Sequence, residues 1–254
     1  MVTRNRFRTQ QVHLPFGEFP ETADVETSSE DYALRFSGAI GAWFLRVQEE
    51  ATLRMLAPYR GASVLEVGGG HGQLTNGLVR NGYRLTVLGS SVICNRRIQR
   101  FVDENRCSFK VGDILALPFP DRSFEIVISY RLLPHVTQWK KFIGELSRVA
   151  EKAVLIDYPS LRSMNCLMPL LFQFKKRLEV NTRRFTSFRE SELLEVFGSF
   201  GFKAAGRYPE FFLPMVLHRI MKSPTLSSAL EGGLRLSGAT RFFGSPVILK
   251  VVRS

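Results

Sequence analysis

The stretch VLEVGGGHGQL, residues 64–74, decides the fold expected for this chain. A short apolar run ends at an acid, Glu66, and is followed by three consecutive glycines, by Gly72 and by a segment suited to a helix. Glycine at a strand-to-helix turn allows positive φ and lets a ligand approach the backbone closely. The start of the helix then presents free N–H groups. The stretch therefore predicts a nucleotide-binding loop at the end of a β-strand.

The spacing of the glycines restricts the nucleotide. A dinucleotide-binding loop has the pattern G-x-G-x-x-G. This chain has glycine at 68, 70 and 72, but Gln73 stands where the last glycine of that pattern would fall. It also has no G-x-x-x-x-G-K-[ST], so a P-loop is excluded. A nicotinamide cofactor is disfavoured for the same reason.

Strand and helix patterns alternate around this loop over about 190 residues, which predicts an α/β fold with a doubly wound, mainly parallel sheet. Seven strands are expected, at residues 63–67, 84–88, 108–111, 125–129, 153–157, 202–207 and 245–252. Helices are expected between them at about 74–81, 92–104, 137–149 and 190–200. In such sheets ligands bind at the carboxyl ends of the strands, so the loops at those ends matter most.

Two further regions flank or interrupt this alternation. Residues 1–30 carry few periodic signals and are expected to form an irregular arm. One or two helices are expected over 31–56, with a break at Ser37 and Gly38. We therefore expect 1–58 to cover the cleft of a single domain over 59–254. Insertions at about 158–188 and 209–240 are expected to form a cap.

Two sequence blocks resemble a known family. LEVGGGHG resembles the first motif of class I S-adenosylmethionine-dependent methyltransferases, in which a strand ends at an acid and G-x-G-x-G follows. VGDILALPFPDRSFEIVISYRLLPHV, residues 111–136, is similar to a block of the small-molecule group that includes the ubiquinone and menaquinone enzymes. The resemblance covers about residues 60–160. It implies a Rossmann-like methyltransferase fold, S-adenosylmethionine as cofactor and methyl transfer to a small or lipid-like metabolite.

The resemblance also implies roles for individual residues around the cofactor and the reaction chamber. Glu66 would lie beneath the methionine part of the cofactor, and Gly68, Gly70 and Gly72 would let the protein backbone pass close to it. Asp113 would accept a hydrogen bond from the adenine amino group, and Ile114 would pack against the adenine ring. Ser129 would lie near the methionine end, and Tyr130 and Arg131 would face the reaction chamber.

The chain departs from the family where the second strand ends. The family has an acid there that binds both ribose hydroxyls, whereas this chain reads LGSS, with Gly89 at the acid position. A serine cannot replace a charged acceptor with two oxygens, and each lost charge-assisted bond costs about 1.5–3 kcal/mol. Three explanations stay open. Ser90, Ser91 or backbone N–H groups replace the acid; an acid arrives from elsewhere in the chain; or the site has decayed and leaves a non-catalytic scaffold. The retained Glu66 and Asp113 favour the first two.

The methyl acceptor is defined less sharply. A general base is needed only if the acceptor must lose a proton, and His135 is the candidate base. Asp157 and Tyr158, at the end of the fifth strand, are candidate substrate contacts. An oxygen acceptor is favoured over carbon or nitrogen. The fourth strand ends in SYRL instead of the N-P-P-[YF] or D-P-P-Y of enzymes that methylate nucleic-acid amino groups, so an RNA-directed enzyme is the disfavoured alternative.

Composition bears on partners and location. The 254 residues carry a net charge of +12, which favours anionic partners. The two cap insertions combine apolar bulk with basic residues, which suits a lipid-like substrate and peripheral contact with a membrane. Three scattered cysteines (Cys94, Cys107 and Cys166) indicate neither a disulfide framework nor a cysteine-based metal site. Reduced thiols and an N-terminus without an apolar signal segment predict a cytoplasmic protein of unknown oligomeric state.

Overall fold

The sheet has seven strands in the order β3-β2-β1-β4-β5-β7-β6. We describe it from a computed structural model, which covers residues 19–69, 72–163 and 185–254. The strands are β1 (Ser63–Val67), β2 (Arg84–Gly89), β3 (Cys107–Val111), β4 (Phe124–Ser129), β5 (Ala150–Tyr158), β6 (Phe202–Pro209) and β7 (Val247–Arg253). Strands β1 to β5 pair in parallel, and β7 runs antiparallel between β5 and β6. The predicted seven-stranded, mainly parallel sheet is therefore confirmed.

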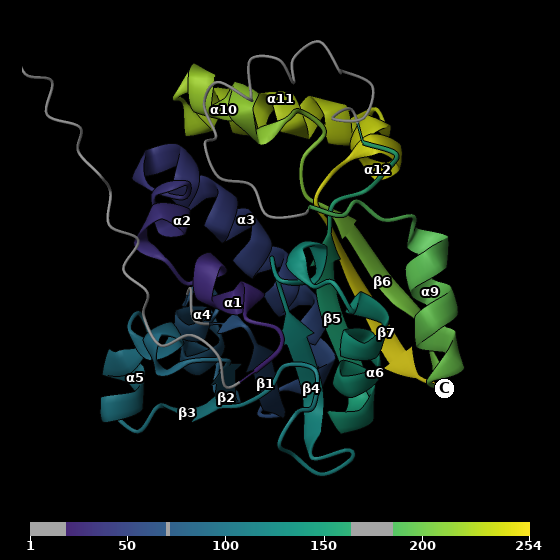
Figure 1. The fold of residues 1–254 in the computed structure, drawn as a ribbon. Helices are drawn as coiled ribbons and strands as arrows, with labels where there is room; N and C mark the ends of the chain where they lie inside the picture. The colour runs from purple at the N-terminus through teal and green to yellow at the C-terminus, as the bar shows by residue number, and fades with distance from the viewer. Residues whose placement is uncertain (1–18, 70–71, 164–184) are drawn as a thin grey trace, which may run out of the picture.

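Helices cover both faces of the sheet (Figure 1). Alternate residues of the inner strands enter two separate cores: Leu65 and Val127 pack in one, and Val64 and Ile126 in the other. This is expected when successive side chains of a strand point to opposite faces and both faces are buried. The helices on the first face are α6 (Trp139–Val149) and α9 (Glu190–Ser199); those on the second are α3 (Gly38–Leu56), α4 (Thr75–Arg80) and α5 (Gln99–Asp103).

The remaining helices gather on the side of the sheet where the parallel strands end (Figure 1). The arm contributes α1 (Ala23–Thr27) and α2 (Glu30–Leu34), and the second insertion contributes α10 (Met215–Met221), α11 (Pro224–Leu236) and α12 (Ala239–Phe243). The break at Ser37 lies between α2 and α3, as predicted. The first cap insertion falls mostly on 164–184, which lies outside the described residues.

Two local expectations were wrong. Residues 23–27 of the arm, expected to be irregular, form α1 and bury Ala23 and Asp24. Tertiary packing supplies the stability that the local pattern lacks. The helix expected over 92–104 is divided into a 3-10 turn (Val92–Asn95) and α5. The division leaves Ile98 fully buried in the second core, so packing overrides the continuous helical pattern.

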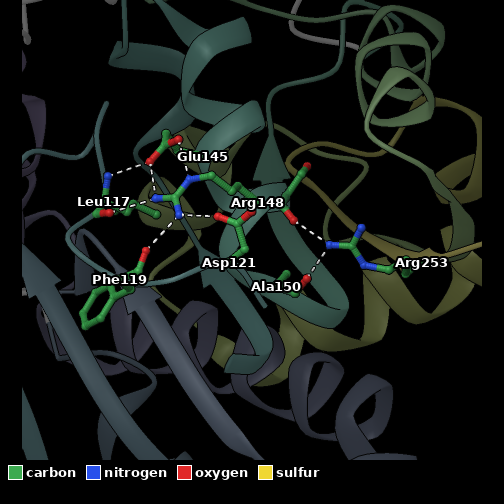
Figure 2. Close-up of polar contacts among 8 residues, drawn as sticks. Leu117, Phe119, Asp121, Glu145, Arg148, Ala150 and Arg253 are labelled. Carbon is green, nitrogen blue, oxygen red and sulfur yellow. Dashed lines mark hydrogen bonds and ion pairs between the residues drawn. The ribbon is translucent and has the colours of Figure 1, made fainter. Parts of the chain in front are cut away.

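Arg148 on α6 holds the LPFPD segment, residues 117–121, in place through hydrogen bonds to three of its residues (Figure 2). Its guanidinium donates to the carbonyl oxygens of Leu117 and Phe119, both at 2.8 Å, and to the carboxylates of Asp121 and Glu145. Glu145 accepts in turn from the Leu117 N–H at 2.7 Å. The segment between β3 and β4 is thus fastened to α6 by a charged network.

Replacing Arg148 with alanine should therefore destabilise the fold. The change leaves two backbone carbonyls and Glu145 without their charged donor, so we expect the free energy of unfolding to fall by about 2 kcal/mol. Urea denaturation followed by circular dichroism measures this loss. The control is Arg100→Ala on α5, which removes only an exposed pair with Glu104 at the end of that helix and should leave stability nearly unchanged. Equal effects of the two changes would contradict the assigned role.

Candidate functional site

Glu66 lies at the carboxyl end of β1, directly before the glycine loop. Its side chain is 2% exposed, and its buried Oε2 atom has no hydrogen-bond partner within the part of the chain that the structure describes. Burial raises the pKa of this carboxyl to about 8. A buried carboxylate oxygen without a donor is costly unless a ligand supplies one. The ammonium group of a bound methionine moiety would fit that requirement, so the residue present here suits S-adenosylmethionine.

The glycine loop that follows Glu66 requires glycine at the two positions that the structure describes. Gly68 and Gly72 have φ values of 76° and 71°, which glycine adopts without strain. A Cβ at Gly68 would lie 2.5 Å from Cδ2 of Leu132, so alanine there would require the Leu132 side chain to shift. Gly70 lies outside the described residues. Positive φ therefore explains glycine at the two positions that the structure describes, and the predicted approach of a cofactor to their backbone stays a prediction.

Asp24, on α1, reaches the end of β2. Its side chain is fully buried, and its carboxylate accepts from the Ser90 N–H at 2.6 Å and from the Ser90 hydroxyl at 2.5 Å. The thiol of Cys94 lies 3.5 Å from the same carboxylate. Burial raises the pKa of Asp24, and the hydrogen bonds from Ser90 oppose that rise. The structure thus brings an acid from the arm to the strand that lacks one.

The other residues predicted for the cofactor lie along the same edge of the sheet. Asp113 and Ile114 follow β3; Asp113 accepts from the Leu115 N–H at 2.8 Å, and Ile114 is fully buried. Ser129 ends β4 and donates to the carbonyl oxygen of Val67 at 3.0 Å, which ties β4 to β1. These bonds hold the strand ends in place, and the predicted cofactor contacts of the three residues stay predictions.

A buried polar network lies under the helical cover, at the ends of β5 and β6. Gln48 of α3 donates through Nε2 to Asp157 at 3.2 Å and to Glu210 at 2.9 Å. All three side chains are buried. Burial raises the pKa of Asp157 to about 6 and, together with the nearby charge of Asp157, that of Glu210 to about 8. The two carboxyls therefore hold about one proton between them near neutral pH.

Arg131 joins this network from the end of β4. Its backbone N–H donates to Asp157 at 2.5 Å, and its guanidinium donates to Oε1 of Gln48 at 3.1 Å. The guanidinium also stacks on the ring of Phe36 at 3.7 Å. Arg131 has a φ of 60°, a strained conformation for a side chain of this size. Such strain persists only where surrounding contacts enforce it, and it concentrates at functional sites.

Tyr130 lies beside the same network, whereas Tyr158 and His135 have other partners. The Tyr130 hydroxyl lies 3.0 Å from the hydroxyl of Thr52. The Tyr158 hydroxyl donates to Glu190 at 2.5 Å, and its ring packs in the core on the α6 face. The His135 ring meets Phe185 edge-on, with centroids 5.7 Å apart. The structure therefore groups Tyr130, Arg131 and Asp157, and the roles predicted for His135 and Tyr158 stay predictions.

A groove of about 600 Å³ runs beside the glycine loop, between α2, α3 and α4. Gly72 and Gln73 line one side of it, and Phe36, which stacks on Arg131, lines the other. Arg97 and Glu30 form an ion pair at its rim. The groove therefore runs past the end of the glycine loop, and Arg131, Gln48, Asp157 and Glu210 are not among the residues that line it.

Sequence reasoning missed three members of this site: Asp24, Gln48 and Glu210. Asp24 lies in an arm without periodic signals, and Glu210 follows an edge strand in an insertion. The available signal for Asp24 was the missing acid at Gly89, for which an acid from elsewhere in the chain was one of three explanations. Gln48 stands among apolar residues on the helical pattern of α3, which was a signal for a buried polar role.

Comparisons with known proteins agree with this geometry. Residues 65–156 match the methyltransferase domain family. These residues are a methyltransferase domain. The match begins in β1 and ends one residue before Asp157, so it includes Glu66, the glycine loop and the ends of β2 to β4. The family match is thus confined to the part of the sheet that runs from β1 into β5.

The relatives share short segments with this chain. Ajmaline N-methyltransferase of Rauvolfia serpentina is 42% identical over 53 residues, which are 21% of this chain and 18% of that protein. A probable chloroplastic tocopherol O-methyltransferase of Oryza sativa subsp. japonica is 44% identical over 46 residues, 18% of this chain and 13% of that protein. The chain thus spans less than a fifth of the length of these relatives.

A solved structure shows the same fold over nearly the whole chain. Magnesium protoporphyrin IX methyltransferase from Synechocystis PCC 6803, determined with bound SAH (S-adenosylhomocysteine), has a TM-score of 0.62 and 16% identity, and covers 90% of this chain and 97% of its own. Another structure of that enzyme carries S-adenosylmethionine. The cofactor expected from the sequence is therefore the one that this fold holds in solved structures.

Proposed function

We propose that this chain transfers a methyl group from S-adenosylmethionine to a small molecule. The observation that carries the proposal is the buried, unpartnered Oε2 of Glu66 at the glycine loop of a methyltransferase domain. Bound S-adenosylmethionine would supply the electrophilic methyl group. Glu66 would hold its ammonium group, and the backbone at Gly68 and Gly72 would approach it closely. We also keep the resemblance to the ubiquinone and menaquinone enzymes as part of the proposal.

Calorimetry with S-adenosylmethionine and S-adenosylhomocysteine tests the proposal. We expect saturable binding of both ligands with one site per chain. NAD serves as the negative control, because the loop lacks the dinucleotide spacing. Absence of binding at millimolar S-adenosylmethionine would overturn the enzyme proposal and favour the alternative, a non-catalytic scaffold of the same fold.

The acceptor in this proposal is an oxygen that must lose its proton. Support comes from the carboxyl pair of Asp157 and Glu210, which Gln48 bridges and which can accept one proton near neutral pH. Attack by a hydroxyl oxygen on a methyl group requires such a proton acceptor. The surrounding aromatic and aliphatic cover would align the acceptor with the methyl group and exclude water. The RNA-directed alternative lacks comparable support in this chamber.

A lipid-like acceptor and membrane contact complete the proposal. The second cap insertion exposes large apolar side chains on α10 to α12, among them Ile220, Leu226, Leu230, Leu236, Phe242 and Phe243. Basic residues stand beside them, including Lys222 and Arg241. Apolar side chains next to cations suit the surface of an anionic membrane. We place the protein in the cytoplasm because the thiols of Cys94 and Cys107 are free and buried.

Liposome flotation checks the membrane contact. None of the helices within residues 19–69, 72–163 and 185–254 could cross a bilayer, so any binding should be peripheral. We expect the protein to float with vesicles containing phosphatidylglycerol and to stay unbound with pure phosphatidylcholine. Replacing Leu236 and Phe242 with serine should weaken the flotation, whereas the same change at Phe200, exposed on the far side from the cap, should not. Equal flotation of all variants would contradict the role given to the cap.

A further inference from the structure

The position that lacks the ribose-binding acid cannot accept one. A Cβ at Gly89 would lie 2.6 Å from the Cβ of Cys94 and 3.2 Å from its sulfur. Cys94 is fully buried, so it cannot move aside without opening the core. The side chain that would grow from residue 89 therefore points into space that Cys94 already fills, and the acid must come from another element if it is present.

The carboxylate of Asp24 lies beside that same space. The Cys94 thiol that blocks residue 89 lies 3.5 Å from Oδ2 of Asp24. The Ser90 N–H and hydroxyl hold the two carboxylate oxygens at 2.6 and 2.5 Å. Asp24 also approaches the glycine loop: its Cβ would be 3.5 Å from a Cβ built on Gly68. An acid from α1 thus lies between the ends of β1 and β2, next to where a strand-two acid would lie.

The hydrogen bonding of Asp24 leaves acceptor positions unused, but its side chain is fully buried, so a ligand hydroxyl can reach it only when the groups that enclose it move apart. A carboxylate has about four acceptor positions, and the hydrogen bonds described for Asp24 come from two donors on Ser90 and from one weak thiol donor. Each of these donors is neutral, so none of them supplies a positive charge to balance the buried carboxylate of Asp24. Burying a carboxylate on such terms is unfavourable. Hydroxyl donors from a ligand would offset this cost.

We propose that Asp24 on α1 replaces the acid that is missing at the end of β2 and accepts hydrogen bonds from the ribose hydroxyls of the cofactor. This rests on the proposed function, because it assumes that S-adenosylmethionine binds at the glycine loop. The proposal also couples cofactor binding to the position of the arm. Asp24 can contact the ribose only while α1 is folded over the strand ends, so binding of the cofactor stabilises the closed arm.

A thermodynamic cycle with one change in the protein and one in the ligand tests the proposal. Calorimetry measures the affinity of wild type and of Asp24→Asn for SAH and for its 2′-deoxy analogue. We expect Asp24→Asn to weaken SAH binding by about 10- to 100-fold, the cost of one charge-assisted bond. Removing the hydroxyl should weaken binding to wild type by a similar factor and to Asp24→Asn by less than about 2-fold, because its partner is already lost.

The control is Asp31→Asn, which removes the same charge from an exposed position on α2 of the same arm and should leave both affinities unchanged. A variant that merely loosens the fold would lose affinity for both ligands equally, which would overturn the proposal. Unchanged or tighter SAH binding by Asp24→Asn would overturn it as well. If wild type binds neither ligand, the proposed function itself fails.

Hydrogen exchange on the wild-type protein gives a readout that does not depend on a stable variant. SAH should slow exchange of the amides over residues 22–28, and the 2′-deoxy analogue, at equal saturation, should slow it less. Faster exchange with SAH would mean that the cofactor displaces α1, and equal protection by the two ligands would mean that the arm does not sense the ribose. Either result would contradict the role given to Asp24.

Discussion

Replacing Glu210 with glutamine is expected to lower kcat for methyl transfer by about 100-fold or more while SAH affinity stays unchanged. General base catalysis contributes about 10²- to 10⁴-fold, and glutamine keeps the size of the side chain and its hydrogen bond with Gln48 but cannot accept the proton. Glu210 lies at the end of β6, and Asp157 lies at the end of β5. A large loss in kcat with an intact cofactor site would identify the pair as the proton acceptor.

The pH profile of the same reaction adds a second measurement. Burial raises the pKa of Asp157 to about 6 and that of Glu210 to about 8. A base works in its deprotonated form, so kcat/KM should rise with pH from about 6 and level off above about 8. Glu210→Gln removes one of the two titrating groups, and the rise toward pH 8 should disappear with it.

The matched control for this prediction is Glu192→Gln, which makes the same change at an exposed position on α9. It should retain wild-type kcat and the wild-type pH profile. A Glu210→Gln variant with wild-type kcat would mean that the carboxyl pair only fastens α3 to the sheet. In that case His135 would become the leading candidate base.

The fold followed from patterns that act locally. β1 was predicted at its observed bounds because an apolar run leads directly into a glycine loop. β4 was predicted to within one residue because an unbroken apolar run is typical of a buried parallel strand. The helix over 92–104 was divided in the structure because burial of Ile98 is decided by distant packing. Periodicity carries information about one element at a time, so it cannot foresee such a division.

The site was foreseen only where its residues belong to a motif. Glu66 and Gly68 stand in one contiguous stretch, and their place at the end of β1 follows from the strand itself. Asp24 and Ser90 are 66 residues apart and meet only after the arm folds across the strand ends. Glu210 and Gln48 are 162 residues apart. No local pattern records such pairings, although the missing acid at Gly89 raised the possibility of one.

Binding of S-adenosylmethionine should become tighter as pH rises, and Glu66 should be the reason. In the free protein burial raises the pKa of Glu66 to about 8, so at neutral pH this carboxyl is mostly protonated. The ammonium of the bound ligand favours the charged form and lowers that pKa. Binding therefore releases a proton below pH 8, and the affinity should fall by up to about tenfold for each pH unit below 8.

Calorimetry of S-adenosylhomocysteine binding at pH 6, 7 and 8, with wild type and Glu66→Gln, measures this effect. The variant cannot lose a proton, so its affinity should be weaker at pH 8 and nearly constant with pH. Titration of the ligand's own ammonium affects both proteins alike, and the difference between them isolates Glu66. 5′-Methylthioadenosine, which lacks the ammonium, should bind wild type with little dependence on pH. A wild-type profile as flat as that of the variant would contradict contact between Glu66 and the ammonium, because the unpartnered Oε2 would then have stayed protonated in the complex.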